Sequence, residues 1–558
     1  MKVSMIRNQL NWYCKWLVSL AVILTSGCFT MADEIVWQWS VPVGNARAYL
    51  WIPPDCQQVR SIVLANHNMI EQGILEHPTM RRALSELSMG QVWVVPNLDY
   101  VFDPAGDAGE RFEKMINALA QESGYSELQH TPVVTLGHSA NATWPWNFAA
   151  WNPDRTLAVL SIHGDAPQTN LTGYGRKNPD WGDRKIDGIP GLMVMGEYEW
   201  WEDRLTPLFK FKAKHPQAAL AMLCDAGHGH FDFSDELVEF LAMFIGKAAQ
   251  ARLPLTPVSV DQVPVLRPVD PKAGYLVDRW HQDAPPTAPS APHAHYTGDR
   301  TQAFWAFDNQ MADAMEKYYA RARGKKPQLL GIKQHDQVLA GEPCQPRFEP
   351  AGDGMTFSLT PCFLEQVSGK GGNPEKWSGL SKGTALGHPA NGGPIRLSQI
   401  VGPVMQVGPT QFRLQFGRAQ FTEDRRNRDI WLLASHPGDE QYKSAVQQIM
   451  LRVNPNKSGK PQTITFPEMA DVPRGTKRVS LHAISDQDLP VQYCVVSGPA
   501  VVAADGKSLE ITGIPPRARF PIPVLIQAWQ WGVSTQPQVQ TAEPVTQLFH
   551  ITRSEHVN

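Results

Sequence analysis

The sequence predicts an α/β protein with a doubly wound parallel sheet, followed by β-sandwich domains in the C-terminal half. Two observations support this fold class. Between residues 60 and 250, short continuous apolar runs alternate with segments of helical periodicity, which is typical of parallel strands covered by helices on both faces. From about residue 329 onward, short strand-like runs follow one another with Gly, Pro and Asn turns between them, which is typical of all-β domains.

The composition indicates a globular chain of several domains. Of 558 residues, 42% are apolar and 19% are charged, which excludes a mainly disordered or fibrous protein. The net charge is only −3 and no long basic run occurs, so we expect no nucleic-acid partner. No run after residue 32 is long and apolar enough to predict a membrane-spanning helix.

Residues 1–32 read as a targeting segment. Three basic residues precede the apolar run Trp16–Leu24, which is too short to cross a bilayer core of ~30 Å but suits a secretory signal. The following Thr25–Cys28 resembles the lipobox of bacterial lipoproteins, with Cys28 as the lipidated residue, although Leu24 stands one position too early. Cleavage after Ala32 would instead release a soluble protein. We therefore expect export, either as a periplasmic or outer-membrane lipoprotein or as a secreted protein.

The first folded unit is expected over residues 33–253. Its strands are predicted from continuous apolar runs at Ser61–Ala65, Val92–Val95, Pro132–Leu136, Leu157–Ile162, Leu192–Met195 and Ala219–Leu223. Apolar residues at helical spacing predict helices over Glu110–Glu122 and Asp235–Ala249. Strands that alternate with helices of this length predict the doubly wound sheet.

Three further segments are expected after this unit. Residues 254–328 combine a Pro-rich connector with one amphipathic helix near Thr301–Ala322. Residues 329–455 form a β-rich domain, and residues 456–558 an Ig-like β-sandwich. From the connector we expect an accessory β-rich half that shares little with the first unit.

A motif that carries chemistry directly follows the predicted strand Pro132–Leu136. The residues are Gly137-His138-Ser139-Ala140-Asn141, and a predicted helix over Ala142–Ala150 comes next. This passage resembles the nucleophile elbow G-x-S-x-G of the α/β-hydrolase superfamily, in which a strained turn lifts the serine above the sheet. Asn141 stands where the family has its last glycine. The resemblance covers about residues 35–253 and implies an α/β-hydrolase sheet with Ser139 as nucleophile.

A serine hydroxyl needs a base to become a nucleophile. The resemblance places the histidine after the last strand, where the sequence reads Asp225-Ala-Gly-His228-Gly-His230-Phe. His230 matches the family pattern best and His228 is the alternative. Cys224, His228 and His230 could also suggest a metal site, but a fourth ligand at a suitable spacing is missing. We expect no metal and no cofactor.

The acid of the triad orients the imidazole. By the resemblance it follows the predicted strand Leu192–Met195, which favours Glu199, with Glu197 as an alternative. Some relatives place the acid after the preceding strand, where Asp165 is the alternative. The chain order Ser139, Glu199, His230 is that of the superfamily.

The oxyanion formed in such a reaction needs backbone N–H donors. The resemblance implies Ala140, the residue after the nucleophile, as one donor. The second is expected in the loop after Ser61–Ala65, at Asn68 or Met69.

The sequence therefore predicts an exported serine hydrolase, with a carboxyl-esterase acting on polysaccharide esters as the leading hypothesis. A loop over 165–188 is long and polar, and five tryptophans lie in segments expected near the site: Trp144, Trp146, Trp181, Trp200 and Trp201. Tryptophan suits sugar rings or aromatic acyl groups. A serine peptidase of the same fold and an inactive carbohydrate-binding protein are the alternatives. No protein partner is inferred.

Overall fold

The computed structural model describes residues 36–368, 373–390, 393–422 and 426–553. The predicted targeting segment, with Cys28, lies outside the described residues. Over the described ranges, no helix combines the length and the apolar character that a membrane crossing requires.

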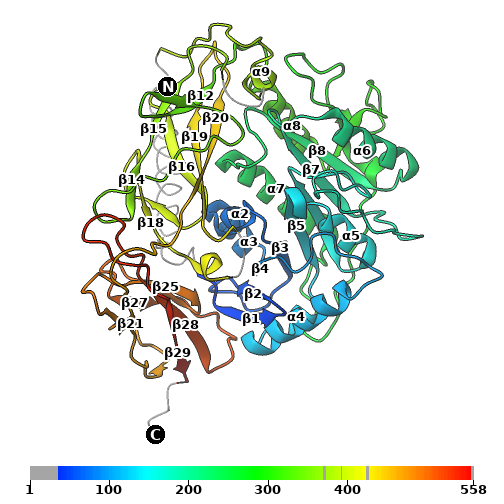
Figure 1. Cartoon of the computed structure of the whole chain (residues 1–558). Helices are drawn as coiled ribbons and strands as arrows, with labels where there is room; N and C mark the ends of the chain where they lie inside the picture. The colour runs from blue at the N-terminus through cyan, green and yellow to red at the C-terminus, as the bar shows by residue number, and fades with distance from the viewer. Residues whose placement is uncertain (1–35, 369–372, 391–392, 423–425, 554–558) are drawn as a thin grey trace, which may run out of the picture.

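One eight-stranded sheet organises the N-terminal half (Figure 1). Its strand order is β1-β2-β4-β3-β5-β6-β7-β8. Strands β3 to β8 run parallel to one another, whereas β2 pairs antiparallel with β4, and β1 pairs antiparallel with β2. The strands are β1 (Trp39–Val43), β2 (Ala46–Trp51), β3 (Ser61–Asn66), β4 (Met89–Val95), β5 (Val133–His138), β6 (Thr156–Ile162), β7 (Pro190–Gly196) and β8 (Ala219–Asp225). This is the α/β-hydrolase fold, with every residue of β3 to β8 buried.

Helices cover both faces of the sheet because alternate strand residues point to opposite cores. Ile62 and Leu64 face the core that includes α4, whereas Val63 and Ala65 face the core that includes α3 and α7. The helices of this unit are α2 (Glu71–Glu76), α3 (Pro78–Glu86), α4 (Ala108–Ser123), α5 (Trp144–Trp151), α6 (Glu202–Lys214) and α7 (Asp235–Arg252). The predicted doubly wound architecture is confirmed.

The predicted helix over Thr301–Ala322 is shorter in the structure. Helix α8 covers Asn309–Ala320, and the Asp308 side chain caps it by accepting a hydrogen bond from Met311 N. The residues before the cap form strand β11 (Ala303–Ala306), which pairs with β9 (Tyr275–Asp278); β10 (Ala291–Pro292) completes this small sheet. Phe304, which lies within the predicted helix, therefore belongs to a strand.

The C-terminal half consists of small sheets, nearly all antiparallel, as expected of a β-sandwich region. Residues 329–455 contain β12 (Leu330–Gln334), β13 (Gln337–Leu339), β14 (Thr356–Ser358), β15 (Thr360–Phe363), α9 (Asn373–Ser378), β16 (Arg396–Val401), β17 (Val404–Gln406), β18 (Gln411–Leu414), β19 (Asp429–His436) and β20 (Ala445–Arg452). Residues 456–558 contain β21 (Ile464–Thr465), β22 (Val472–Pro473), β23 (Arg478–Ser480), β24 (Ile484–Ser485), β25 (Gln492–Ser497), β26 (Ala500–Val502), β27 (Ser508–Ile511), β28 (Ile522–Trp529) and β29 (Val545–Thr552).

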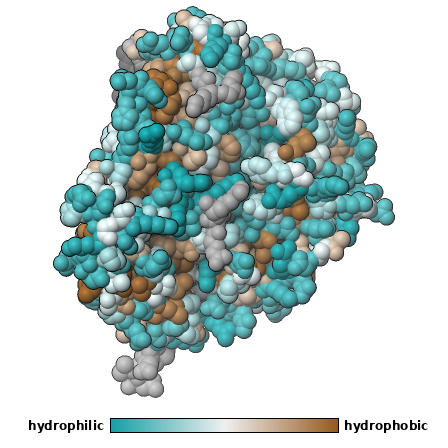
Figure 2. Space-filling model, viewed as in Figure 1, coloured by the Kyte–Doolittle hydropathy of each residue, from teal (hydrophilic) through white to brown (hydrophobic). Residues whose placement is uncertain are grey.

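The two halves share their hydrophobic cores. Ile400, Trp431 and Val446 of the β-rich half belong to the same buried cluster as Val63 and Trp93 of the central sheet. The second cluster likewise joins α4 to β28 and β29. Figure 1 shows α2 between the sheet and the β-rich half, and Figure 2 shows a mainly hydrophilic outer face. The expectation of a loosely attached accessory half is therefore wrong.

We predict that residues 33–253 do not fold stably on their own. Without the later strands, the apolar surface of α2 and of the sheet edge would be exposed to water, which favours aggregation. Residues 33–558 serve as the control and should unfold in one cooperative transition by circular dichroism. A soluble 33–253 fragment with a cooperative transition near that of the control would contradict the prediction.

Candidate active site

The turn after β5 holds Ser139 in a strained conformation. Ser139 has φ of +53°, a region that non-glycine residues seldom occupy, and is buried between β5 and α5. Gly137 is required here, because a Cβ on it would lie 2.0 Å from Asn141 O. Asn141, which replaces the expected glycine, donates from Nδ2 to His67 O at 2.8 Å and so fastens the elbow to the loop after β3.

The loop after β8 brings His230 to this serine. Ser139 Oγ and His230 Nε2 are 2.6 Å apart, and His230 Nδ1 lies 2.5 Å from Glu199 Oε2. Hydroxyl, imidazole and carboxylate thus form one hydrogen-bonded chain, which is the geometry that activates a serine for attack. The structure brings together the three residues that the sequence predicts for the triad.

Glu199 lies in the loop between β7 and α6 and is buried. Its carboxylate accepts hydrogen bonds from Gly196 N at 2.9 Å and from an Arg204 Nη1 at 2.7 Å, and His163 Nδ1 lies 2.5 Å away. Burial raises the pKa of Glu199, but the charges of Arg204, His230 and His163 outweigh it and hold this pKa well below its usual range. Glu199 is therefore ionised at neutral pH.

The other sequence candidates are engaged elsewhere. His228 Nδ1 lies 2.5 Å from Asp232 Oδ2. Burial lowers the pKa of His228, but the charges of Asp225 and Asp232 outweigh it and raise this pKa to about 9. Glu197 accepts from Gly227 N at 2.9 Å and lies 3.2 Å from the ammonium of Lys443.

Asp165 anchors the 165–188 loop. It accepts from Thr172 N at 2.7 Å, while the Thr172 hydroxyl donates to Ser139 O at 2.9 Å. In the described part of the chain, no three His, Cys, Asp or Glu side chains are grouped so as to hold a metal ion.

The predicted oxyanion donors Asn68 and Met69 need correction. Their backbone N–H groups donate to Glu71 Oε2 at 2.9 and 2.7 Å, and His138 N donates to Glu71 Oε1 at 3.1 Å. Because each N–H has one proton to donate, these two groups are already committed to the buried carboxyl. Burial raises the pKa of Glu71 to about 7 although the N–H groups oppose the rise. The role of Ala140 N as an oxyanion donor stays a prediction.

Three residues that support the site are absent from the sequence prediction: Glu71, His163 and Arg204. His163 has φ of +47° and packs edge-on against His138 at 5.7 Å between ring centroids. The Glu199 carboxylate raises the pKa of His163 against the effect of burial. Only the position of His163 directly after a predicted strand could have signalled a role, because the carboxyl ends of parallel strands meet at one edge.

The β-rich half supports the histidine loop directly. Gln448 of β20 donates from Nε2 to Asp232, and a Cβ on Gly229 would lie 2.6 Å from the same Nε2. Glu342 Oε1 accepts from His230 N at 3.4 Å. The site therefore contains residues from beyond the unit over 33–253 to which the sequence assigns it.

The tryptophans divide into two groups. Trp144, Trp146 and Trp181 are each 1% exposed and pack in the core, so they cannot offer a surface to a substrate. Trp201 is 46% exposed, and Trp200 is half-buried against Trp280 at 4.5 Å between ring centroids.

Comparison with known proteins shows only remote likenesses. No family model matches the chain, and no curated protein is similar to it in sequence. Among solved structures, a dienelactone hydrolase from Anabaena variabilis is 17% identical, with 38% of this chain and 96% of that chain covered at a TM-score of 0.26. An esterase from Pyrobaculum calidifontis is 16% identical, with 45% and 94% covered at 0.29. An S-formylglutathione hydrolase from Agrobacterium tumefaciens is 15% identical, with 38% and 92% covered at 0.27.

The fold and the geometry together define a class of protein. The strand order and the turn at Ser139 give the α/β-hydrolase fold, and the loops after β5, β7 and β8 bring a serine, a glutamate and a histidine into hydrogen-bonding distance. Their order along the chain is that of serine hydrolases with this fold.

We predict that Glu199→Gln lowers the free energy of unfolding by about 3–5 kcal/mol, because it removes the closer of the two carboxylates that pair with the buried Arg204. The pKa of Glu199 is lower in the folded state than in the unfolded state. The ionised carboxylate therefore makes its full contribution to the free energy of unfolding above the unfolded pKa of about 4.3. That contribution is lost as the pH falls through the folded pKa, and the two proteins should converge in acid. Urea unfolding of wild type and variant from pH 7 to 3 measures this, with the exposed Glu349→Gln as control. A constant difference at all pH values would contradict it.

Proposed function

We propose that this protein is a serine hydrolase that cleaves ester bonds through an acyl-enzyme. The observation that supports this most is the continuous hydrogen-bonded chain from Ser139 Oγ through His230 to the ionised Glu199. The strained backbone of Ser139 adds to it, because such strain persists where the surrounding structure enforces it and clusters at active sites.

Each residue has a distinct role in this proposal. Ser139 Oγ attacks the ester carbonyl while His230 Nε2 takes the hydroxyl proton, and the same proton then passes to the leaving alcohol. Glu199 holds the imidazole in place and stabilises its cationic form. The N–H of Ala140 follows the nucleophile, where it can donate to the negatively charged carbonyl oxygen. Water then releases the acid by the reverse sequence, with His230 again as base.

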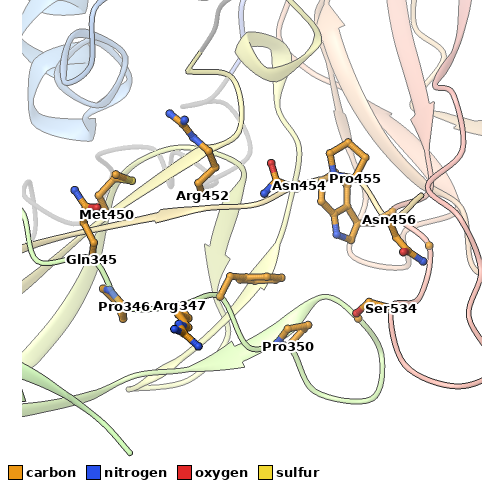
Figure 3. A pocket seen from close by; sticks show the side chains of 14 residues that line it. Gln345, Pro346, Arg347, Pro350, Met450, Arg452, Asn454, Pro455, Asn456 and Ser534 are labelled. Carbon is orange, nitrogen blue, oxygen red and sulfur yellow. The ribbon is translucent and has the colours of Figure 1, made fainter. Parts of the chain in front are cut away.

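For the substrate we propose acyl or methyl esters of polysaccharide. A cavity of about 550 Å³ in the β-rich half has room for more than one sugar ring (Figure 3). Because no triad residue lines it, it would hold a part of the polysaccharide away from the ester that is cleaved. Gln345 and Met450 lie at one end of it, and Asn456 and Ser534 at the other. Polar amides beside the half-buried Phe348 give it the mixed lining that sugars require.

A serine peptidase of the same fold is the second candidate, since the same three side chains can cleave amides. An inactive carbohydrate-binding protein is the third, favoured by the size of the β-rich half. Turnover of aryl esters without cleavage of aminoacyl amides separates the first candidate from the second. Binding to insoluble polysaccharide without any turnover would favour the third.

We predict that Ser139→Ala and His230→Ala each reduce ester hydrolysis at least about 10⁴-fold. The double variant should be little slower than either single variant, because nucleophile and base act as one unit. A serine-directed organophosphate should label the wild type at Ser139 and leave Ser139→Ala unlabelled, as measured by mass spectrometry. His228→Ala, which changes the neighbouring histidine, is the control for the loop and should keep Ser139 reactive. Full activity of the Ser139 and His230 variants would refute the mechanism.

We also propose that the protein is exported, with Cys28 lipidated. If so, Cys28→Ser should move the protein from the membrane fraction to the soluble fraction, because the acyl chains provide the attachment. Fractionation followed by immunoblotting measures this, with Cys14→Ser as the matched control. An unchanged distribution would leave cleavage near Ala32 as the route of export.

A further inference from the structure

Glu342 is a carboxylate of the β-rich half that lies against the histidine of the site. Its Oε1 accepts a hydrogen bond from His230 N at 3.4 Å, and its side chain is half-buried. The backbone beside it is fixed, because Gly341 N donates to Gln447 Oε1 at 3.1 Å and Gln447 Nε2 donates back to Gly341 O at 2.5 Å. Strand β20 therefore holds Glu342 in position at His230.

Glu342 has no ion-pair partner among the residues that the structure describes. Its recorded hydrogen bond in these described ranges is the one from His230 N. Burial, followed by the negative charge of Glu199, raises the pKa of Glu342 to about 7; Asp232 acts in the same direction, whereas Lys376 and the His230 N–H oppose the rise. The one long hydrogen bond from His230 N leaves lone pairs of this half-buried carboxylate able to accept hydrogen bonds from a ligand.

The position of Glu342 indicates which part of a substrate it meets. In the proposed mechanism His230 hands its proton to the leaving alcohol, so groups packed around His230 flank the alcohol part of the ester. Phe231 is half-buried on the same loop, edge-on to His230 at 4.6 Å and 5.0 Å from Trp431 between ring centroids. Phe231 and Glu342 both contact His230. An aromatic ring and a carboxylate around one histidine suit a sugar, which offers an apolar ring face and hydroxyl donors.

We propose that Glu342 is a specificity-determining residue, which accepts hydrogen bonds from the hydroxyl groups of a neutral sugar on the alcohol side of the ester. This inference rests on the proposed function and narrows its substrate class. A sugar that itself bears a carboxylate is disfavoured, because it would bring a second negative charge to Glu342.

Glu342→Gln tests this with three esters: an acetylated neutral methyl glycoside, the corresponding acetylated uronic acid glycoside, and 4-nitrophenyl acetate. Relative to the aryl ester, kcat/KM for the neutral glycoside should fall about tenfold, since a charged hydrogen bond becomes a neutral one. Relative to the same reference, kcat/KM for the uronic acid glycoside should rise several-fold. Glu349→Gln, an exposed carboxylate of the same half, is the matched control and should change neither ratio.

Opposite changes for the two glycosides cannot arise from general damage to the fold. Equal changes would overturn the role of Glu342.

Should the variant fail to fold, the wild type gives a second test. Its preference for the neutral over the uronic acid glycoside should rise several-fold between pH 6 and 8, as Glu342 ionises. A flat preference would overturn the proposal. If the wild type hydrolyses the aryl ester and is labelled at Ser139, the proposed serine-hydrolase function stands whatever the glycosides show. If the wild type does neither, the proposed function and the role of Glu342 are both refuted.

Discussion

The buried carboxylate of Glu199 is the interaction on which the site depends. It contacts His230, His163 and Arg204 and also accepts the N–H of Gly196, so it joins the ends of β6, β7 and β8. Burial of a charge without partners is costly, and here three cationic or titratable groups stabilise it. The orientation of the imidazole and the packing of three loops are therefore fixed by the same group. A change at Glu199 consequently affects both stability and catalysis.

A second constraint comes from the β-rich half, which lies over the histidine loop. Asp232 accepts from Gly229 N at 3.0 Å within that loop and from Gln448 of β20 outside it. Ser444 O accepts the hydroxyl of Tyr198 at 3.0 Å, which supports the acid loop in the same way. Because both loops take support from one strand and the residues before it, the β-rich half is structurally part of the site. Its contact with His230 through Glu342 gives that half a route to select the substrate.

Glu71 has a comparable role between the loop after β3 and the residue before the serine. A buried carboxyl that accepts three backbone N–H groups can hold an irregular loop rigid without a glycine-rich sequence. Asn141 joins the same loop to the elbow through His67 O. These bonds explain how this chain departs from the usual glycine pattern around the nucleophile and still keeps a tight turn.

The sequence by itself determined the doubly wound sheet and its nucleophile turn, because continuous apolar strands and a glycine–serine turn are local patterns. It also identified Ser139, His230 and Glu199 as candidates, since their order follows the order of strands. It favoured Glu199 over Glu197 and Asp165 only through the family spacing, because all three carboxylates follow buried strands and only the contacts of the folded loops show that Glu199 meets His230. Glu71, Arg204 and Glu342 were decided by tertiary structure alone: their partners are distant in sequence or are backbone groups, and such contacts leave no periodic trace in the chain.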